Sequence, residues 1–310
     1  MKKSKSIPYL KWGISGYILL SGMEFISKIL GIAFTSILAR KIGLTELSLL
    51  LLAQGFISFV VTYSTAGNGN LAIRELEEGG DISAIMNAVT HSRLLLATPF
   101  TILIFLIAGI FYKDTIPYMA VLAPIPFILI LDQQFIHQWK KTLLNIATFR
   151  ILTGLTIILS GLFLVFTLDI SNVFIAITYT LGQLSVTGLS ILLARKYFKI
   201  DLSKKRARKY DFLRKSSTAG ISALLNTLLL YLPLLLAHAS QVNHRIESIG
   251  ISTRLWFFIA FPLMSLSTIL LPLVLESNES RHKNLRRFLL YSLSYATATC
   301  ISVFLLGHQF

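Results

Sequence analysis

Cysteine, clustered histidine and acidic residues are all scarce in this chain. Cys300 is its single cysteine, so no intrachain disulfide can form. The six histidines are scattered and lack the spacing of a metal site. The 14 Asp and Glu residues lie mostly in predicted loops and form no hydrolytic constellation. We therefore expect neither an enzyme nor a metal site, and the absence of a Walker pattern predicts no nucleotide cofactor.

Charge as a whole is also scarce. Only 14% of the residues are charged, against about a quarter in soluble domains, and 54% are hydrophobic. The apolar residues form runs of about 18 or more, which is long enough to cross a bilayer core. The basic N-terminus resembles a signal peptide, but no small-residue cleavage pattern follows the first run. We predict an all-α, polytopic membrane protein with a retained first span, a cleaved signal being the minor alternative.

Nine apolar runs predict nine membrane spans. They lie near 14–38, 47–66, 95–112, 116–132, 149–168, 172–194, 218–237, 249–275 and 288–306. The mixed segment 81–94 predicts an amphipathic helix at the membrane surface that leads into the third span. If the N-terminus is cytoplasmic, 23 of the 29 Lys and Arg residues fall on the cytoplasmic side and five on the opposite side. Cytoplasmic loops carry such an excess, so the N-terminus is predicted inside.

Ten Lys and Arg residues lie in the segment 195–215. Predicted spans flank it, so contact with anionic lipid headgroups is favoured and nucleic-acid binding is not expected. The segment also divides the chain. We predict a six-helix bundle over 1–200, a basic cytoplasmic loop over 201–217 and the first three helices of a second bundle over 218–310. A weak internal match at an offset of about 200 residues brings span 2 over span 8, which is typical of two-bundle transporters.

Three stretches resemble lipid-linked oligosaccharide flippases. "ILARKIGLTELSLLLLAQGF" (37–56) and "STAGNGNLAIRELEEGG" (64–80) resemble the first two spans of that family, and 224–274 resembles its seventh and eighth spans. The chain is therefore similar to the O-antigen and polysaccharide flippases of the multidrug/oligosaccharidyl-lipid/polysaccharide exporter superfamily. Family members usually have twelve or more spans. This chain ends after nine predicted spans, so the second bundle is expected to be incomplete.

The resemblance implies a MATE-like transporter of two bundles in the bacterial cytoplasmic (inner) membrane. Such a protein would flip an undecaprenyl-diphosphate-linked oligosaccharide repeat unit from the inner to the outer leaflet. The product would serve O-antigen, lipopolysaccharide or capsule biosynthesis. Membrane lipids would be its surroundings, and the polysaccharide polymerase and glycosyltransferases that share its substrate would be its partners.

Glu24 and Lys28 lie near the middle of the first predicted span. They are four residues apart on a helix and can pair. Charged groups at membrane depth are expected to face the bundle interior or a water-filled cavity. In the functional interpretation, Lys28 contacts the diphosphate, and Glu24 holds Lys28 or takes part in proton coupling. In the alternative, the pair only fixes the packing of the span.

Four further polar residues are candidates for substrate binding. Arg254 suits a diphosphate because guanidinium matches phosphate oxygens in a fork, the alternative being an interfacial arginine beside Trp256. Gln54, Gln183 and Asn226 lie within predicted spans, where amides either line a sugar path or tie helices together. Kinks that act as hinges or only shape the bundle are predicted at Pro124, Pro126, Pro233, Pro262 and Pro272.

Other classes of function remain open. A drug exporter of the same superfamily would favour an acidic cavity, whereas the charges of Glu24, Lys28 and Arg254 add up to a positive one. A polymerase-type glycan enzyme would need a large external loop, and the predicted external loops are short. A truncated, inactive membrane protein is the remaining alternative.

The basic segment 195–215 supplies a direct test of the predicted orientation. We expect a cysteine at Ser203, in a Cys300→Ser background, to resist an impermeant thiol reagent in intact cells and to react after lysis. The reason is the excess of Lys and Arg on the cytoplasmic side. Mass spectrometry of the labelled peptide measures the reaction, and labelling in intact cells would overturn the orientation.

Overall fold

The computed structural model describes residues 9–65, 67–167, 172–198 and 209–239, together with Leu290, Ser294 and Thr297. The regular secondary structure of these residues is entirely helical, as the sequence predicted. The α-helices are α1 (Tyr9–Ile42), α2 (Leu44–Thr65), α3 (Asn68–Glu77), α4 (Ile82–Phe111), α5 (Ile116–Leu122), α6 (Pro124–Ile130), α7 (Gln134–Trp139), α8 (Leu143–Thr167), α9 (Ile177–Phe198) and α10 (Lys209–Ala239). Two short 3-10 helices are η1 (Lys113–Thr115) and η2 (Asn172–Ala176).

Six helical segments of the described residues are long and apolar enough to cross a membrane. They are Leu19–Ile42, Leu44–Glu77, Ile82–Phe111, Lys113–Ile130, Leu144–Thr167 and Asn172–Lys196. They correspond to the first six predicted spans. The seventh predicted span, 218–237, is helical within α10. The predicted spans 249–275 and 288–306 lie outside the described residues, apart from Leu290, Ser294 and Thr297.

The helix predicted over 81–94 is present and leads directly into the third predicted span, while its place at the membrane surface stays a prediction. Residues 82–111 form one continuous helix, α4, whose N-cap Asp81 accepts a hydrogen bond from the Ser83 amide at 3.1 Å. Most side chains from Ser83 to Arg93 are buried, several of them in a core shared with α3, and this packing stabilises the helix despite its mixed composition. The fourth predicted span, in turn, is interrupted at Ala123. Pro124 begins α6 because proline cannot donate an amide hydrogen bond to the preceding turn.

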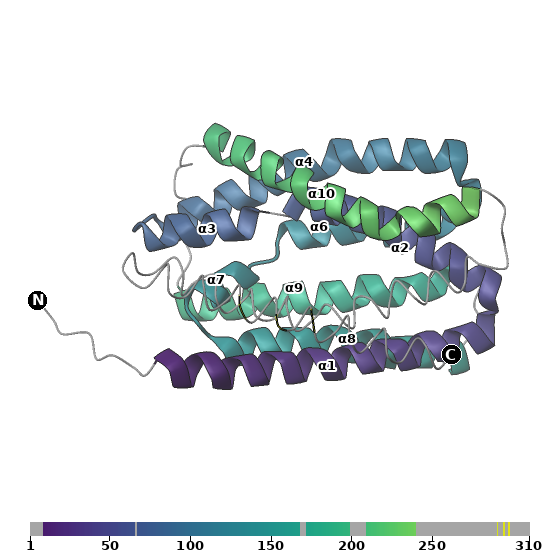
Figure 1. The fold of residues 1–310 in the computed structure, drawn as a ribbon, viewed down its shortest axis with the longest axis horizontal. Coiled ribbons are helices and arrows are strands. Elements are labelled where there is room, and N and C mark those ends of the chain that lie inside the picture. Colours follow the sequence, from purple (N-terminus) through teal and green to yellow (C-terminus); the bar gives the residue numbers. More distant parts are fainter. Residues whose placement is uncertain are drawn as a thin grey trace, which may run out of the picture.

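The helices pack in two layers (Figure 1). One layer holds α1, α8 and α9, and the other holds α2, α4, α6 and α10, with α3 at one end. Contacts of α6 with α9, and of α1 with α2, join the layers. The main apolar core surrounds α2, which is the most deeply buried helix of the bundle. A second core joins α3, α4, α7 and α9 at the end where α3 and α7 lie.

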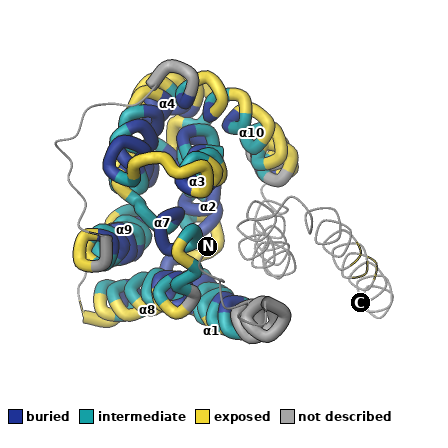
Figure 2. The backbone as a smooth tube through the Cα atoms, turned by 90° about the vertical axis from the view of Figure 1, so that its left-hand side faces the viewer, coloured by how far each residue is buried: buried dark blue, intermediate teal, exposed yellow. Residues whose placement is uncertain are grey.

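Exposed residues follow the outer sides of the helices (Figure 2). Many of them are large and apolar. Ile110 on α4, Phe166 on α8 and Leu229 on α10 are each about two-thirds exposed, at 67%, 70% and 68%. Water would penalise an apolar surface of this extent, whereas lipid tails accept it. The exposed surface therefore supports the membrane assignment that the long apolar helices indicate.

Helix α10 packs along α2 and α4. Ser216 donates a 2.6 Å hydrogen bond to Oδ1 of Asn68, and both side chains are fully buried. Further along, Gly220 lies so close to α2 that an added Cβ would stand 2.5 Å from the Tyr63 carbonyl oxygen. The predicted basic loop, 201–217, is helical from Lys209 onward. The division of the chain into two bundles stays a prediction.

Glycines also allow α1 and α8 to approach closely. A Cβ added at Gly161 would lie 2.1 Å from Cζ of Phe34, whose ring is buried and cannot move aside freely. At Gly109 of α4, by contrast, an added Cβ meets nothing within 4 Å. Close backbone approach at small residues is the usual way in which membrane helices associate.

We expect Gly161→Ala to lower the free energy of unfolding by about 1–3 kcal/mol, because the new methyl group overlaps the Phe34 ring. The control Gly109→Ala adds the same methyl group where there is room, and should leave stability unchanged or slightly raised. Thermal unfolding in detergent measures both variants. Equal melting temperatures for the two would show that α1 and α8 do not pack as described.

Candidate functional site

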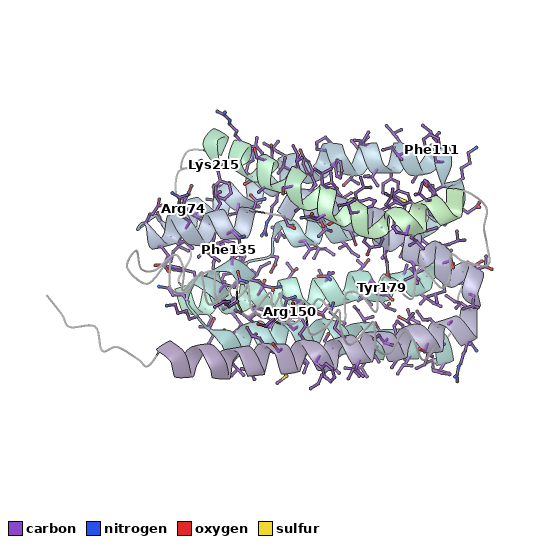
Figure 3. The ribbon with its side chains drawn as sticks, in the orientation of Figure 1. Arg74, Phe111, Phe135, Arg150, Tyr179 and Lys215 are labelled. Carbon is purple, nitrogen blue, oxygen red and sulfur yellow. The ribbon has the colours of Figure 1, made fainter. Side chains whose placement is uncertain are left out.

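A buried ion pair joins α1 and α8. The Glu24 side chain is buried, with 6% of its surface exposed, and its Oε1 lies 3.7 Å from Nη1 of Arg150. The Arg150 side chain is 38% exposed and belongs to the layer of α1, α8 and α9 (Figure 3). The carboxylate is thus held inside the bundle while part of the guanidinium remains accessible.

Packing on both sides positions this ion pair. Leu20, one turn before Glu24, packs in a small core with Ile146 and Ala147 of α8. One turn after Arg150 stands Gly154, where an added Cβ would lie 2.6 Å from Oγ of Ser27. The two helices therefore approach closely on either side of the charges. This arrangement excludes lipid from the carboxylate, whose exposure to hydrocarbon would be costly.

Arg150 is a site residue that the sequence analysis missed. It was counted with the cytoplasmic segment because it directly precedes most of the fifth apolar run. The available signal was its position, one turn before Gly154 on the same predicted helix. Lys28 is partly buried one turn beyond Glu24 on α1. Pairing of Glu24 with Lys28 stays a prediction, and the structure adds Arg150 as an ion partner of Glu24.

The other predicted site residues lie on different helices. Gln54 on α2 and Gln183 on α9 are partly buried, and Asn226 on α10 is exposed. Arg254 lies outside the described residues. The prediction that these side chains converge on one substrate path is therefore open.

A second polar cluster, which we call the Asp132 junction, lies where α6 ends. Its members are Ser92 and Arg93 of α4, Asp132 and Gln133 of the α6–α7 turn, and Thr187 and Ser190 of α9. Arg93 is buried and donates from Nη1 to the carbonyl oxygens of Leu129, at 3.0 Å, and Asp132, at 2.6 Å. The Leu129 carbonyl also accepts from the Asp132 amide at 3.2 Å, in the turn where the chain leaves α6. The buried Arg93 cation completes the cap at this end of the broken span.

Asp132 and Ser190 connect this turn to α9. The Ser190 hydroxyl donates to Oδ1 of Asp132 at 3.1 Å, and it accepts from the Gln133 amide at 3.3 Å. Asp132 also accepts from the Gln134 amide at the start of α7. Nothing in the sequence analysis pointed to this junction, because its residues come from three segments far apart in the chain.

His137 on α7 is fully buried beside the junction. Its Nε2 lies 3.5 Å from the Ser190 carbonyl oxygen, and its Nδ1 lies 3.2 Å from Nδ2 of Asn145. A proton on Nε2 fits both contacts, since the carbonyl only accepts and the amide nitrogen only donates. Burial lowers the pKa of His137, an effect that the Ser190 carbonyl and the Asp132 carboxylate oppose. The lowered pKa favours the neutral form of the imidazole.

The Glu24–Arg150 pair predicts a charge-swap effect. We expect Arg150→Glu to lower the melting temperature and membrane abundance, because it places a second carboxylate beside the buried Glu24. The double variant Glu24→Arg/Arg150→Glu should recover much of the loss. As a control, Arg74→Glu sets a carboxylate beside Glu78 on exposed α3, where water screens the repulsion and little change is expected. A double variant no better than Arg150→Glu would contradict the pairing.

Comparison with known proteins bears on the fold alone. The chain matches no known protein family and no curated protein by sequence. A solved structure named "protein A" has the same fold, with a TM-score of 0.72 and 16% sequence identity. The alignment covers 98% of this chain and 73% of that one. The chain is therefore an all-α helical bundle with a solved structural counterpart, and its function follows from neither comparison.

Proposed function

We propose that this chain is a transporter of lipid-linked oligosaccharides in the bacterial cytoplasmic membrane. It would move an undecaprenyl-diphosphate-linked repeat unit from the inner to the outer leaflet, for O-antigen or capsule synthesis. Nine spans in a MATE-like arrangement of two bundles, with the N-terminus in the cytoplasm, belong to the same proposal. The glycosyltransferases that build the substrate and the polymerase that uses it would be its partners.

The charges inside α1 and α8 carry the proposal. Glu24, Lys28 and Arg150 supply two positive charges and one negative charge within helices long and apolar enough to cross a membrane. Charged residues in such helices usually mark a substrate or ion path. A positive excess suits an anionic diphosphate and disfavours cationic drugs, which would be the substrates of an exporter from the same superfamily.

The geometry of the ion pair suits a phosphate contact. Glu24 is buried and holds one side of Arg150, while more than a third of the Arg150 side chain is exposed. The planar guanidinium can therefore keep its carboxylate partner and still present donors to a phosphate oxygen. Lys28, one turn further along α1 and partly buried, would add a second donor with a flexible stem.

Transport by the purified chain tests this function. Vesicles would contain the protein and a polyprenyl-diphosphate oligosaccharide with a fluorescent sugar, and an impermeant reductant would quench the outer leaflet. We expect Lys28→Ala to slow the quenching of inner-leaflet substrate by about tenfold or more, the usual effect of losing a charge-assisted hydrogen bond. Lys28→Arg, which keeps the positive charge, should retain most of the rate.

Arg74→Ala is the matched control. It also removes one positive charge, but from the exposed surface of α3, where the side chain pairs with Glu78. Its rate should equal that of the unaltered chain. The proposal fails if the folded, unaltered chain moves the lipid no faster than protein-free vesicles do, or if the Lys28 and Arg74 variants behave alike.

A further inference from the structure

The Asp132 junction contains four buried polar atoms that have no hydrogen-bond partner within the described part of the chain. They are Ser92 Oγ, Arg93 Nε, Gln133 Oε1 and Thr187 Oγ1. Ser92, Arg93 and Thr187 are only 1%, 5% and 2% exposed. A buried polar atom without a partner is unfavourable, and native proteins rarely leave one in that state.

Hydrogen bonds connect Arg93, Gln133 and the turn of α9 that carries Thr187, and Ser92 directly precedes Arg93 on α4. The Nη1 atom of Arg93 reaches the Asp132 carbonyl oxygen, which directly precedes Gln133 in the chain. The amide of Gln133 donates to the hydroxyl of Ser190. That hydroxyl also lies 2.9 Å from the carbonyl oxygen of Thr187. The residues that carry the four atoms thus come from α4, α9 and the α6–α7 turn, which these hydrogen bonds link.

The chemistry of the four atoms identifies the missing partner. Arg93 Nε can only donate, Gln133 Oε1 can only accept, and the two hydroxyl groups can do both. A metal cation is disfavoured by the Arg93 guanidinium, and an anion is disfavoured by the Asp132 carboxylate nearby. Water both donates and accepts, and it satisfies buried polar groups of this kind in many proteins.

We propose that the Asp132 junction is a water-binding site. Ordered water accepts from Arg93 and donates to Gln133, and it bridges the hydroxyl groups of Ser92 and Thr187. Non-helical backbone within a membrane bundle persists only where protein or water satisfies its polar groups. Arg93 binds the carbonyls at the end of α6, and the water satisfies the polar side-chain atoms of the junction. The fourth span can therefore end at Ile130 inside the bundle, independently of what the chain transports.

Removal of one hydroxyl group distinguishes a wet junction from a dry one. Thr187→Val keeps the shape of the side chain but cannot bond to water. If water occupies the junction, the variant removes one of the hydrogen-bond partners of that water, and we expect the melting temperature to fall by about 2–4 °C. In a dry junction it removes an unsatisfied buried hydroxyl, and the melting temperature would rise. Thr187→Ser keeps the hydroxyl and should melt close to the unaltered chain.

Thr178→Val on the same helix is the matched control. Thr178 is fully buried, but its hydroxyl donates to the Ile175 carbonyl oxygen at 2.9 Å and needs no water. Thr178→Val should therefore change the melting temperature less than Thr187→Val does.

Ser92→Ala is a second, independent test of water in the Asp132 junction. Alanine is the better helix former and cannot clash, so a fall in melting temperature there would come from lost hydration. The comparison for it is Ser48→Ala, in which the lost hydroxyl donates to Leu44 within its own helix. A melting temperature that stays unchanged or rises in both Thr187→Val and Ser92→Ala would show that the junction is dry and would overturn the proposal.

Discussion

Backbone amide and carbonyl groups in an apolar bundle must find their partners inside the protein, because lipid offers none. Within a helix each group meets this requirement through its own turn, so every long apolar run among the described residues is helical. The requirement becomes demanding only where a helix stops. The carbonyls that α6 leaves behind are bound by Arg93 of another helix, thirty-six and thirty-nine residues away. The junction around Asp132 thus exists because the fourth span ends early.

Close approach of helices is the second condition for this bundle. Lipid tails are as apolar as leucine, so burial of apolar surface does little to drive helices together. Dispersion contacts must do so, and they require short distances. Gly154 and Gly161 bring α8 against Ser27 and Phe34 of α1, and Gly220 brings α10 against the backbone of α2. The small residues therefore determine which helices become neighbours.

The charged residues in the layer of α1, α8 and α9 also depend on close helix packing. Glu24 is buried at a point where α1 and α8 are held together from both sides, and Arg150 reaches it from the accessible side. The pair both stabilises the contact of the two helices and leaves a guanidinium partly exposed. A structural role and a role in binding an anionic substrate are compatible here, since the same arginine can serve both partners.

The amino-acid sequence by itself determined the helical class and the positions of the six helices that are long and apolar enough to cross a membrane, because the length and hydropathy of each run are local properties. It also predicted that Glu24 and Lys28 face away from lipid, and Glu24 is buried. It failed where a residue's role depends on a distant segment. Arg150 was assigned to a loop, and Arg93 and Asp132 were not singled out, because their partners lie on other helices. Likewise, the sequence predicted a helix before residue 95 but not that this segment packs in a core with α3. Only the tertiary structure decided these points, because the sequence pattern of one helix does not show which other helix packs against it.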